Sequence, residues 1–215
     1  MDPANPPDRA AEVRIAVLAS GSGTNLQALL DDDYVGRRIA LVAADRADAY
    51  ALERARARSV EAVNLDPTEH SGRDAYGRAL VDLLRSRSID LVVMAGFMRV
   101  LSAEAVHAFE GRLLNVHPSL LPAFPGAHAV ADALAWGVRV TGVTVHLVDE
   151  EVDHGPIVLQ EAVEIRPGDD RETLEARIHE AEHRLLPRAV RALAEGRLRV
   201  EGRAVVIAEP VEAAT

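Results

Sequence analysis

The sequence predicts an α/β protein built on a mostly parallel sheet with helices on both faces. Short, continuous apolar runs alternate with stretches of helical periodicity along most of the chain. Strands of a parallel sheet are buried on both faces and are therefore apolar throughout, and helical crossovers join them. A glycine-rich turn follows the first apolar run directly, which favours a Rossmann-like sheet.

The apolar runs are predicted to be strands because each is short, rich in aliphatic residues and bounded by polar or turn-forming residues. The first run, VRIAVLA, leads into the glycine-rich turn, and the second, IALVAA, ends at Asp45. In chain order the predicted strands cover residues 13–19, 39–44, 60–65, 91–96, 112–116, 140–148 and 157–165.

Helical periodicity fills the space between most of these strands. In RDAYGRALVDLLRSR, Tyr76, Leu80 and Leu84 fall on one side, which predicts an amphipathic helix. The first predicted helix begins near residue 26. The others lie around residues 51–59, 73–87, 132–137 and 171–195. The stretch RLRVEGRAVVI near the C-terminus predicts a small hairpin with Glu201 and Gly202 at its turn.

A single domain over residues 13–207 is the simplest organisation, because no linker, repeat or low-complexity segment interrupts that range. Residues 1–12 are Pro-rich and polar, and we expect them to form a flexible N-terminal tail. Residues 208–215 are expected to form a C-terminal tail. No stretch resembles a signal peptide or a transmembrane span, so we expect a cytoplasmic protein.

The composition excludes several kinds of site. The chain has no cysteine, which rules out disulfides, thiolate zinc sites and thiol nucleophiles. Its 34 acidic and 24 basic residues give a formal net charge of -10. Broad binding to a phosphate backbone needs clustered cations, so we expect no nucleic-acid partner.

The loop SGSGTN, residues 20–25, lies between a predicted strand and a predicted helix. Gly21 and Gly23 allow positive φ and a close backbone approach, and Thr24 or Asn25 is expected to cap the helix. Such a turn presents free backbone N–H groups and the positive end of a helix to an anion.

Three interpretations of this loop can be compared. A dinucleotide is supported by the two glycines and by Asp45 at the end of the second strand, but Leu26 stands where a third glycine is needed. Two glycines and a hydroxyl suit a single phosphate monoester better than a pyrophosphate. A plain tight turn without a ligand stays open, because the pattern alone has little specificity.

A second candidate site lies in LLNVHPSLLPAFPG, residues 113–126. Asn115 and His117 are two positions apart on a predicted strand, so their side chains point to the same face at the end where α/β sheets bind ligands. Asp153, in the turn-rich loop VDEEVDHGP, is a candidate partner that would fix the imidazole tautomer and raise its pKa.

Asn115, His117 and Asp153 would stabilise an oxyanion and transfer a proton without providing a nucleophile. The nucleophile would then be a second substrate, which indicates group transfer. The alternative is an ordinary strand-end histidine with an unrelated loop aspartate.

HEAEH, residues 179–183, matches the H-E-x-x-H pattern that places two histidines on one helical face for zinc. A catalytic zinc needs a third protein ligand, and no downstream pattern supplies one. We therefore expect no metal, and a helix beside the pocket from which Glu182 or His183 reaches a ligand.

Together these motifs resemble the phosphoribosylglycinamide formyltransferase family, purine-pathway enzymes that use 10-formyltetrahydrofolate. The resemblance spans essentially all of residues 13–207 and rests on SGSGTNLQALL, MAGFMRVLS, LLNVHPSLLPAFPG and TGVTVHLVDEEVDHGPIVLQ, in the family's order. It implies the formyltransferase fold. It also implies transfer of a formyl group to the amine of phosphoribosylglycinamide (GAR), giving N-formyl-GAR and tetrahydrofolate in de novo purine (IMP) biosynthesis.

The resemblance also implies roles for individual residues. Asn115, His117 and Asp153 match the catalytic trio, in which Asn115 and protonated His117 donate to the oxyanion and Asp153 favours the charged imidazole. The implied phosphate and GAR contacts are Gly23, Thr24, Asn25 and Glu182. The implied folate contacts are Arg73, Met98, Arg99, Val100, Leu101, Asn115, Asp149 and Asp153.

His154 departs from the family pattern, because many relatives carry a small residue after the catalytic aspartate. The co-substrate implied is 10-formyltetrahydrofolate, and the partners are small molecules rather than nucleic acid or membrane. The sequence does not give the oligomeric state, and a homodimer stays open.

The alternatives are a formyltetrahydrofolate hydrolase and a non-catalytic folate-binding relative. The hydrolase is expected to carry a regulatory domain that residues 1–12 are too short to form. The acidic net charge disfavours a methionyl-tRNA formyltransferase. Leu26, in place of the third glycine of a dinucleotide site, disfavours an NAD-dependent oxidoreductase.

Overall fold

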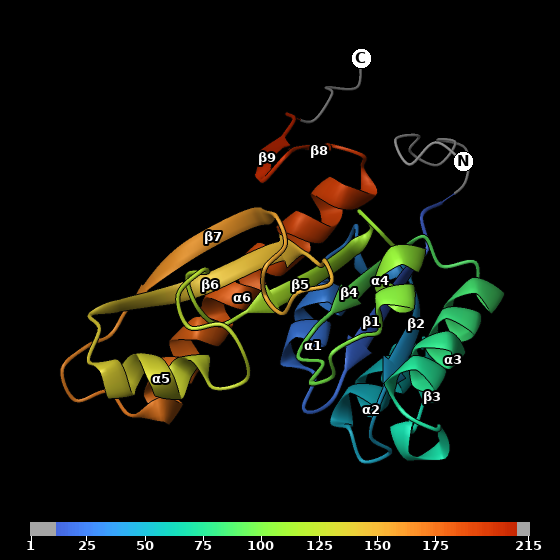
Figure 1. The fold of residues 1–215 in the computed structure, drawn as a ribbon, viewed down its shortest axis with the longest axis horizontal. Coiled ribbons are helices and arrows are strands. Elements are labelled where there is room, and N and C mark those ends of the chain that lie inside the picture. The colour runs from blue at the N-terminus through green and yellow to red at the C-terminus, as the bar shows by residue number, and fades with distance from the viewer. Residues whose placement is uncertain (1–11, 210–215) are drawn as a thin grey trace.

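The centre of the protein is a seven-stranded sheet in the order β3-β2-β1-β4-β5-β6-β7, in a computed structural model that describes residues 12–209 (Figure 1). Neighbouring strands among the first five are parallel, whereas β6 is antiparallel to β5 and β7 is antiparallel to β6. The α/β fold with a mostly parallel sheet is thus confirmed. The strands are β1 (Ile15–Ala19), β2 (Ile39–Ala44), β3 (Glu61–Asn64), β4 (Leu91–Met94), β5 (Leu113–His117), β6 (Val140–Leu147) and β7 (Ile157–Glu164).

All the predicted helices are present, together with one that no periodicity predicted. The unpredicted α4 is only six residues long, and the Ser102 hydroxyl caps it by accepting from Ala105 N. The longest helix, α6, begins with a capping box between Asp170 and Thr173. The helices are α1 (Thr24–Asp31), α2 (Tyr50–Ala57), α3 (Arg73–Ser86), α4 (Ala103–Ala108), α5 (Ala129–Trp136) and α6 (Arg171–Ala194), with short 3-10 turns η1 (Gly36–Arg38) and η2 (Pro67–Glu69).

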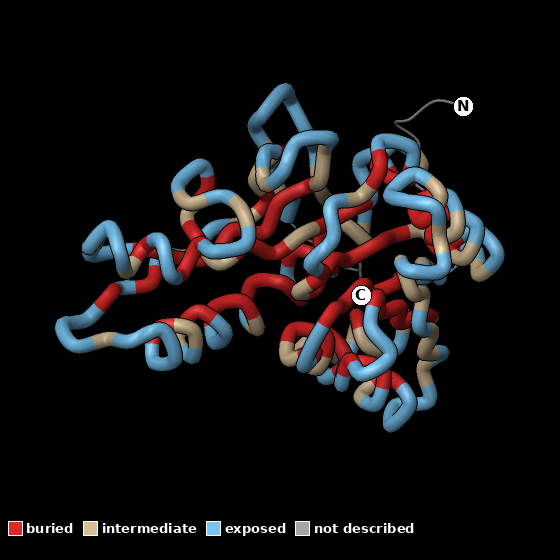
Figure 2. Tube along the Cα trace, turned by 60° about the horizontal axis from the view of Figure 1, so that its bottom comes forward, coloured by how far each residue is buried: buried red, intermediate tan, exposed pale blue. Residues whose placement is uncertain are grey.

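The sheet is buried on both faces, as β1 shows most clearly. Ile15, Val17 and Ala19 pack into one apolar cluster with side chains of α1, α2, α5 and α6. Ala16 and Leu18, which point the other way, pack into a second cluster with side chains of α3 and α4. The buried segments accordingly run through the middle of the molecule, and the exposed ones lie in the loops around it (Figure 2). This burial explains why the parallel strands are apolar at consecutive positions.

The predicted C-terminal hairpin forms a separate two-stranded sheet from β8 (Leu198–Glu201) and β9 (Ala204–Ile207). Its turn lies on Gly202 and Arg203, one residue later than predicted, because Glu201 still pairs with Ala204. The hairpin stands beside β7, at the end of the molecule where α6 ends (Figure 1).

The predicted tails fall almost wholly outside the described residues, apart from Glu12, Ala208 and Glu209. The single domain over residues 13–207 stays a prediction. None of the helices within residues 12–209 combines the length and apolar character needed to cross a bilayer.

Candidate active site

Two adjoining cavities, of about 530 and 220 Å³, lie at the carboxyl ends of the parallel strands. The glycine-rich loop after β1, the turn after β4 and the end of β5 all meet there, as expected for an open α/β sheet. Val116 and Pro118, on either side of His117, line both cavities. The other residues common to both are Gly96, Met98, Arg99 and Ala127.

The larger cavity is bounded by residues 20–25 on one side and by α6 on the other. Gly23 occupies the N-cap position of α1 with φ 71°, and no side chain caps this helix. The expectation that Thr24 or Asn25 is the cap is therefore wrong, because the helix already begins at Thr24 and the left-handed turn needs a glycine before it. The first-turn N–H groups of α1 are left without a side-chain acceptor, which suits an anion.

Gly23 is also in close contact with α2, which fixes how the loop is folded. A Cβ built on Gly23 would lie 2.9 Å from both the Cα and the Cβ of Ala51, whereas a Cβ on Gly21 would meet no atom within 4 Å. We expect Gly23→Ala to lower the free energy of unfolding by about 2 kcal/mol, through left-handed strain and this clash. Gly21→Ala is the matched control. Equal denaturant midpoints for the two variants would contradict this account.

Glu182 is a buried carboxyl group that faces the larger cavity from α6. It is 5 % exposed, and its Oε2 accepts a hydrogen bond from Asn25 Nδ2 at 2.9 Å. Asn25 is itself 8 % exposed, and its Oδ1 has no hydrogen-bond partner among the described residues. Burial raises the pKa of Glu182 above its ordinary value of 4.5, although the Asn25 amide lowers it. The pair thus places a carboxyl group at the wall of the larger cavity, which fits a ligand with N–H or O–H groups.

The raised pKa gives a prediction on stability. A carboxyl group with a raised folded-state pKa loses stabilisation as the pH rises above 4.5, because ionisation is easier in the unfolded chain. We expect Glu182→Gln to increase the free energy of unfolding at pH 8 by about 1 kcal/mol and to leave it unchanged near pH 4. Denaturant unfolding at both pH values measures this. Glu180→Gln, exposed on the same helix, should show no such pH-dependent gain. A loss of stability at pH 8 in Glu182→Gln would contradict the prediction.

The smaller cavity lies between the turn after β4 and the acidic loop after β6. Of the residues implied as folate contacts, those that line it are Met98, Arg99, Val100, Leu101, Asn115, Asp149 and Asp153. Met98 and Val100 are large apolar side chains with 70 % and 54 % exposure, as expected at the mouth of an apolar binding site. Arg73 is exposed at the start of α3 and lines neither cavity.

Asn115, His117 and Asp153 come together at the smaller cavity. Asn115 Nδ2 is 3.4 Å from Asp153 Oδ1, and His117 Nδ1 is 3.3 Å from Asp153 Oδ2. The backbone N–H of Gly126 donates to Asp153 Oδ2 at 2.7 Å. His117 Nε2 lies 2.8 Å from the carbonyl oxygen of Phe124. Both nitrogens of His117 therefore face acceptors of the protein, and its Nε2–H must leave Phe124 to reach a ligand.

Asp153 raises the pKa of His117, as expected, but this effect does not decide the direction of the net shift. Burial lowers the pKa of His117 below its ordinary value of 6.5, and this outweighs the opposite effects of the Phe124 carbonyl and the Asp153 charge. Burial also raises the pKa of Asp153. Hydrogen bonds from His146 and the Gly126 N–H, together with the charges of His117 and His146, outweigh burial and lower this pKa below 3.8. At neutral pH the site therefore holds an ionised aspartate and a histidine that is harder to protonate than usual.

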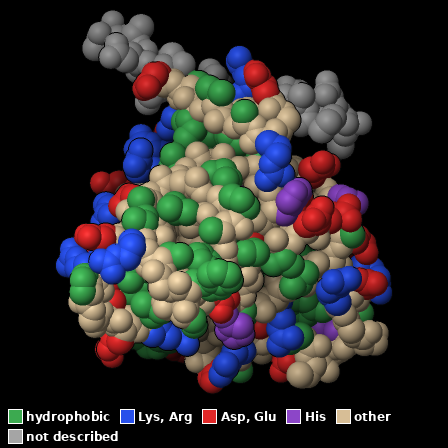
Figure 3. All heavy atoms as spheres, turned by 60° about the vertical axis from the view of Figure 1, so that its left-hand side comes forward, with side chains coloured by type: hydrophobic (Ala, Val, Ile, Leu, Met, Phe, Trp, Pro, Cys, Tyr) green, Lys and Arg blue, Asp and Glu red, His purple; other side chains and the backbone are tan. Residues whose placement is uncertain are grey.

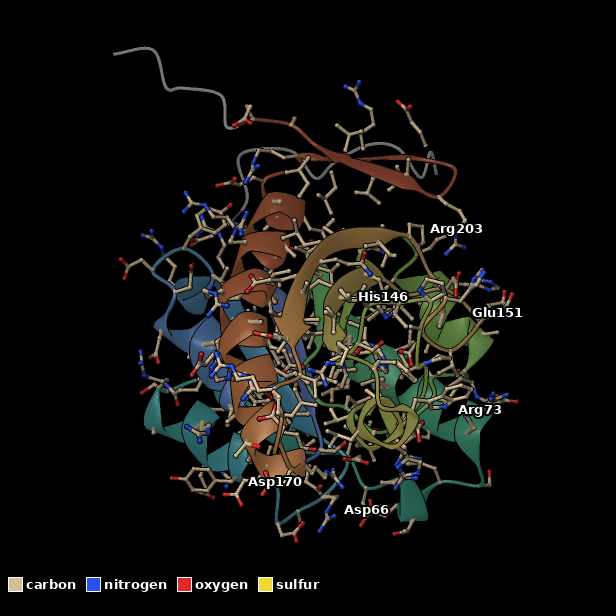
Figure 4. The ribbon with its side chains drawn as sticks, turned by 90° about the vertical axis from the view of Figure 1, so that its left-hand side faces the viewer. Asp66, Arg73, His146, Glu151, Asp170 and Arg203 are labelled. Carbon is tan, nitrogen blue, oxygen red and sulfur yellow. The ribbon has the colours of Figure 1, made fainter. Side chains whose placement is uncertain are left out.

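His146 belongs to the same cluster but was not predicted from the sequence. It is 2 % exposed on β6, where the antiparallel register places it opposite Asn115. Its Nε2 is 3.2 Å from Asn115 Nδ2 and 3.7 Å from Asp153 Oδ1, and Figure 4 shows it within the molecule. The signal in the sequence was a lone histidine in the apolar run VTGVTVHLV. Its partner could not be inferred without knowing that β6 pairs with β5.

The two histidines of HEAEH are stacked on each other rather than directed at a common point. The rings of His179 and His183 are 6.1 Å apart and nearly parallel. Across residues 12–209, no group of three or more histidine or acidic side chains is placed to hold a metal ion. Glu182, between them, points to the cavity and Asn25 instead.

Asp45, which supported the dinucleotide alternative, is engaged by a side chain of the site. Arg99 Nε donates to Asp45 Oδ2 at 2.8 Å, and the Asp45 side chain is 3 % exposed. Leu26 is fully buried in the core behind the glycine-rich loop. This ion pair fixes Arg99 at the border of the two cavities.

The sequence and the structure were each compared with those of known proteins. The family profile described as formyl transferase matches residues 13–190. Phosphoribosylglycinamide formyltransferase of Mycobacterium tuberculosis (strain H37Rv) is 48% identical over 204 residues, covering 94% of each chain. The Escherichia coli K12 protein of the same name is 40% identical and covers 87% of this chain and 90% of its own. The crystal structure of glycinamide ribonucleotide transformylase 1 from Symbiobacterium toebii superposes with a TM-score of 0.90 at 50% identity, covering 95% of this chain and 98% of that one.

Proposed function

The chain belongs to the formyl transferase family, and on that premise we propose that it transfers a formyl group from 10-formyltetrahydrofolate to the amine of GAR. The products are N-formyl-GAR and tetrahydrofolate, in the biosynthesis of purines. The observation that carries the proposal is the meeting of Asn115, His117 and Asp153 beside two adjoining cavities of different chemistry.

GAR is assigned to the larger cavity because that cavity has the features its two ends require. The uncapped start of α1 at Gly23, Thr24 and Asn25 offers backbone N–H groups to the phosphate. Glu182, which Asn25 holds at the cavity wall, suits the N–H and O–H groups of the rest of the molecule. A donor group of the substrate would give the Glu182 carboxylate a second hydrogen bond beside the one from Asn25, which offsets the cost of burying its charge.

10-Formyltetrahydrofolate is assigned to the smaller cavity as the formyl donor. Met98, Val100 and Leu101 supply apolar surface for a planar ring system, and the acidic loop from Asp149 to Asp153 supplies polar partners. The ends of β4 and β5 separate the two cavities only partly, because both cavities share residues there. A formyl group held in the smaller cavity would thus lie next to an amine held in the larger one.

The reaction forms one bond and breaks another at the formyl carbon. The amine nitrogen of GAR attacks this carbon, and its oxygen becomes an oxyanion that accepts from Asn115 Nδ2 and from His117. The bond between the formyl carbon and N10 of the folate then breaks. The proton lost by the amine replaces the formyl group on N10, through ordered water.

His117 changes role during this reaction. The free ring is biased to the neutral form by burial, but a developing oxyanion adds a further acceptor beside Asp153 and favours the imidazolium. The oxyanion then competes with the Phe124 carbonyl for the Nε2–H. The ring thus takes up the proton lost by the amine when the negative charge forms and returns it, through ordered water, to N10, while Asp153 keeps the ring oriented.

The relatives named above favour this transferase over a formyltetrahydrofolate hydrolase and over a non-catalytic folate-binding protein. The deciding experiment mixes the purified protein with 10-formyltetrahydrofolate and follows the deformylated folate, with and without GAR. Turnover only with GAR supports the transferase. Turnover without GAR would identify a hydrolase. Binding of the folate without turnover would identify a non-catalytic folate-binding protein.

A further inference from the structure

The C-terminal hairpin is in direct contact with the loop that carries Asp153. At the hairpin turn, Arg203 Nη2 donates to the carbonyl oxygen of His154 at 2.6 Å, and its Nη1 lies 3.1 Å from His154 Nε2. These residues are 49 positions apart in the sequence. Figure 4 shows Arg203 at the tip of the hairpin, reaching toward the loop that bears Glu151.

His154 also contacts Asp149, at the start of the loop. Its Nδ1 is 2.7 Å from Asp149 Oδ2, and Asp149 Oδ1 accepts from the backbone N–H of Glu151 at 3.1 Å. A carboxylate at Nδ1 requires a proton there, so in the neutral ring Nε2 is an acceptor, which a guanidinium N–H satisfies. Arg203, His154 and Asp149 thus form one continuous chain of hydrogen bonds. The face in Figure 3 shows basic, histidine and acidic side chains gathered below the hairpin.

Little else among the described residues fixes the outer part of this loop. Val152 is 54 % exposed, and Glu151 is exposed as well. Glu150 pairs with His107 of α4, but both side chains are about 60 % exposed, and such surface pairs contribute little. Asp153 has φ 53°, an unusual backbone conformation for a residue with a side chain, which the surroundings have to maintain.

We propose that Arg203 is a positioning residue for the formyl donor. Through His154 it holds the Asp149–Asp153 loop in the conformation that forms the wall of the smaller cavity and places the Asp153 carboxylate beside His117. This rests on the proposed function, since the loop is taken to contact the folate. The residue that departs from the family pattern, His154, is thereby the link between hairpin and loop.

The test compares Arg203→Gln with Arg199→Gln, a matched change on the same hairpin at an exposed arginine. We expect Arg203→Gln to raise KM for 10-formyltetrahydrofolate by roughly two- to fivefold, because the two hydrogen bonds that it loses are exposed to solvent, with KM for GAR and the melting temperature unchanged. Arg199→Gln should behave as the wild type. Equal rises in both KM values, a lowered melting temperature, or no change would overturn the proposal.

A second readout does not depend on the reaction. Backbone amides of residues 149–154 should exchange hydrogen several-fold faster in Arg203→Gln than in the wild type or Arg199→Gln. His154→Ala should give a smaller effect, because the His154 carbonyl still accepts from Arg203. The double variant should exchange at least as fast as Arg203→Gln, because it also loses the contact between His154 and Asp149. Unchanged exchange in Arg203→Gln would sink the inference even if the enzyme transfers formyl groups. Faster exchange in a protein without transferase activity would uphold the contact and refute only the proposed function.

Discussion

Replacing Asp153 by Asn will lower kcat for formyl transfer by about 10³-fold while leaving the protein folded. The carboxylate accepts from the Gly126 N–H and lies within 3.4 Å of both Asn115 Nδ2 and His117 Nδ1. An amide has only one oxygen, so its NH₂ group must face one of these nitrogen neighbours. The change also removes the negative charge that raises the pKa of His117 against burial, so the imidazolium becomes harder to form.

Asn is the suitable replacement because it should change the rate of formyl transfer without changing the stability of the fold. Asp153 has φ 53°, and Asn tolerates this left-handed conformation better than other residues with a side chain. Thermal unfolding should therefore stay within a few degrees of the wild type. Asp132→Asn, an exposed change on α5, is the control and should keep full activity. A variant Asp153→Asn that retains more than about a tenth of the wild-type kcat would exclude Asp153 from the mechanism.

Asn115→Ala should lower kcat by about 10²–10³-fold with little change in either KM, as for the loss of one oxyanion donor. Asn115 stands in the middle of β5, lines the smaller cavity and offers its Nδ2 beside Asp153 and His146. The expected effect falls on kcat because the hydrogen bond strengthens only as the formyl oxygen becomes negative.

Asn64→Ala is the matched control for this change. Asn64 also belongs to a parallel strand, β3, but it is exposed and lines neither cavity. It should retain wild-type rates. If Asn115→Ala instead raises KM for the folate and leaves kcat unchanged, Asn115 binds the donor without stabilising the transition state.

The fold could be predicted because burial on both faces makes each parallel strand a continuous apolar run. Local pattern was insufficient for α4, which is too short to show a period, and for the hairpin turn, which shifted by one residue. Local pattern also gave the wrong N-cap for α1, because the positive φ at that position requires a glycine and so makes Gly23 the N-cap.

The candidate site was predicted in part, for a similar reason. Asn115 and His117 could be recognised because they interrupt an apolar strand at its carboxyl end. His146 could not be assigned to them, since its place opposite Asn115 follows from strand pairing. The direction of the pKa shift of His117 depends on how deeply the folded chain buries the ring, and no sequence pattern reports that depth.

The two edges of the sheet have a consequence for how the protein behaves at high concentration. β3, at one edge, is only four residues long and carries the exposed Glu61, whose carboxylate pairs with Arg87. β7, at the other edge, has an exposed Glu164 and lies in contact with β9. Short, charged or covered edges resist strand-to-strand aggregation between molecules. The hairpin that bears Arg203 thus stands at the edge where self-association through added strands would otherwise begin.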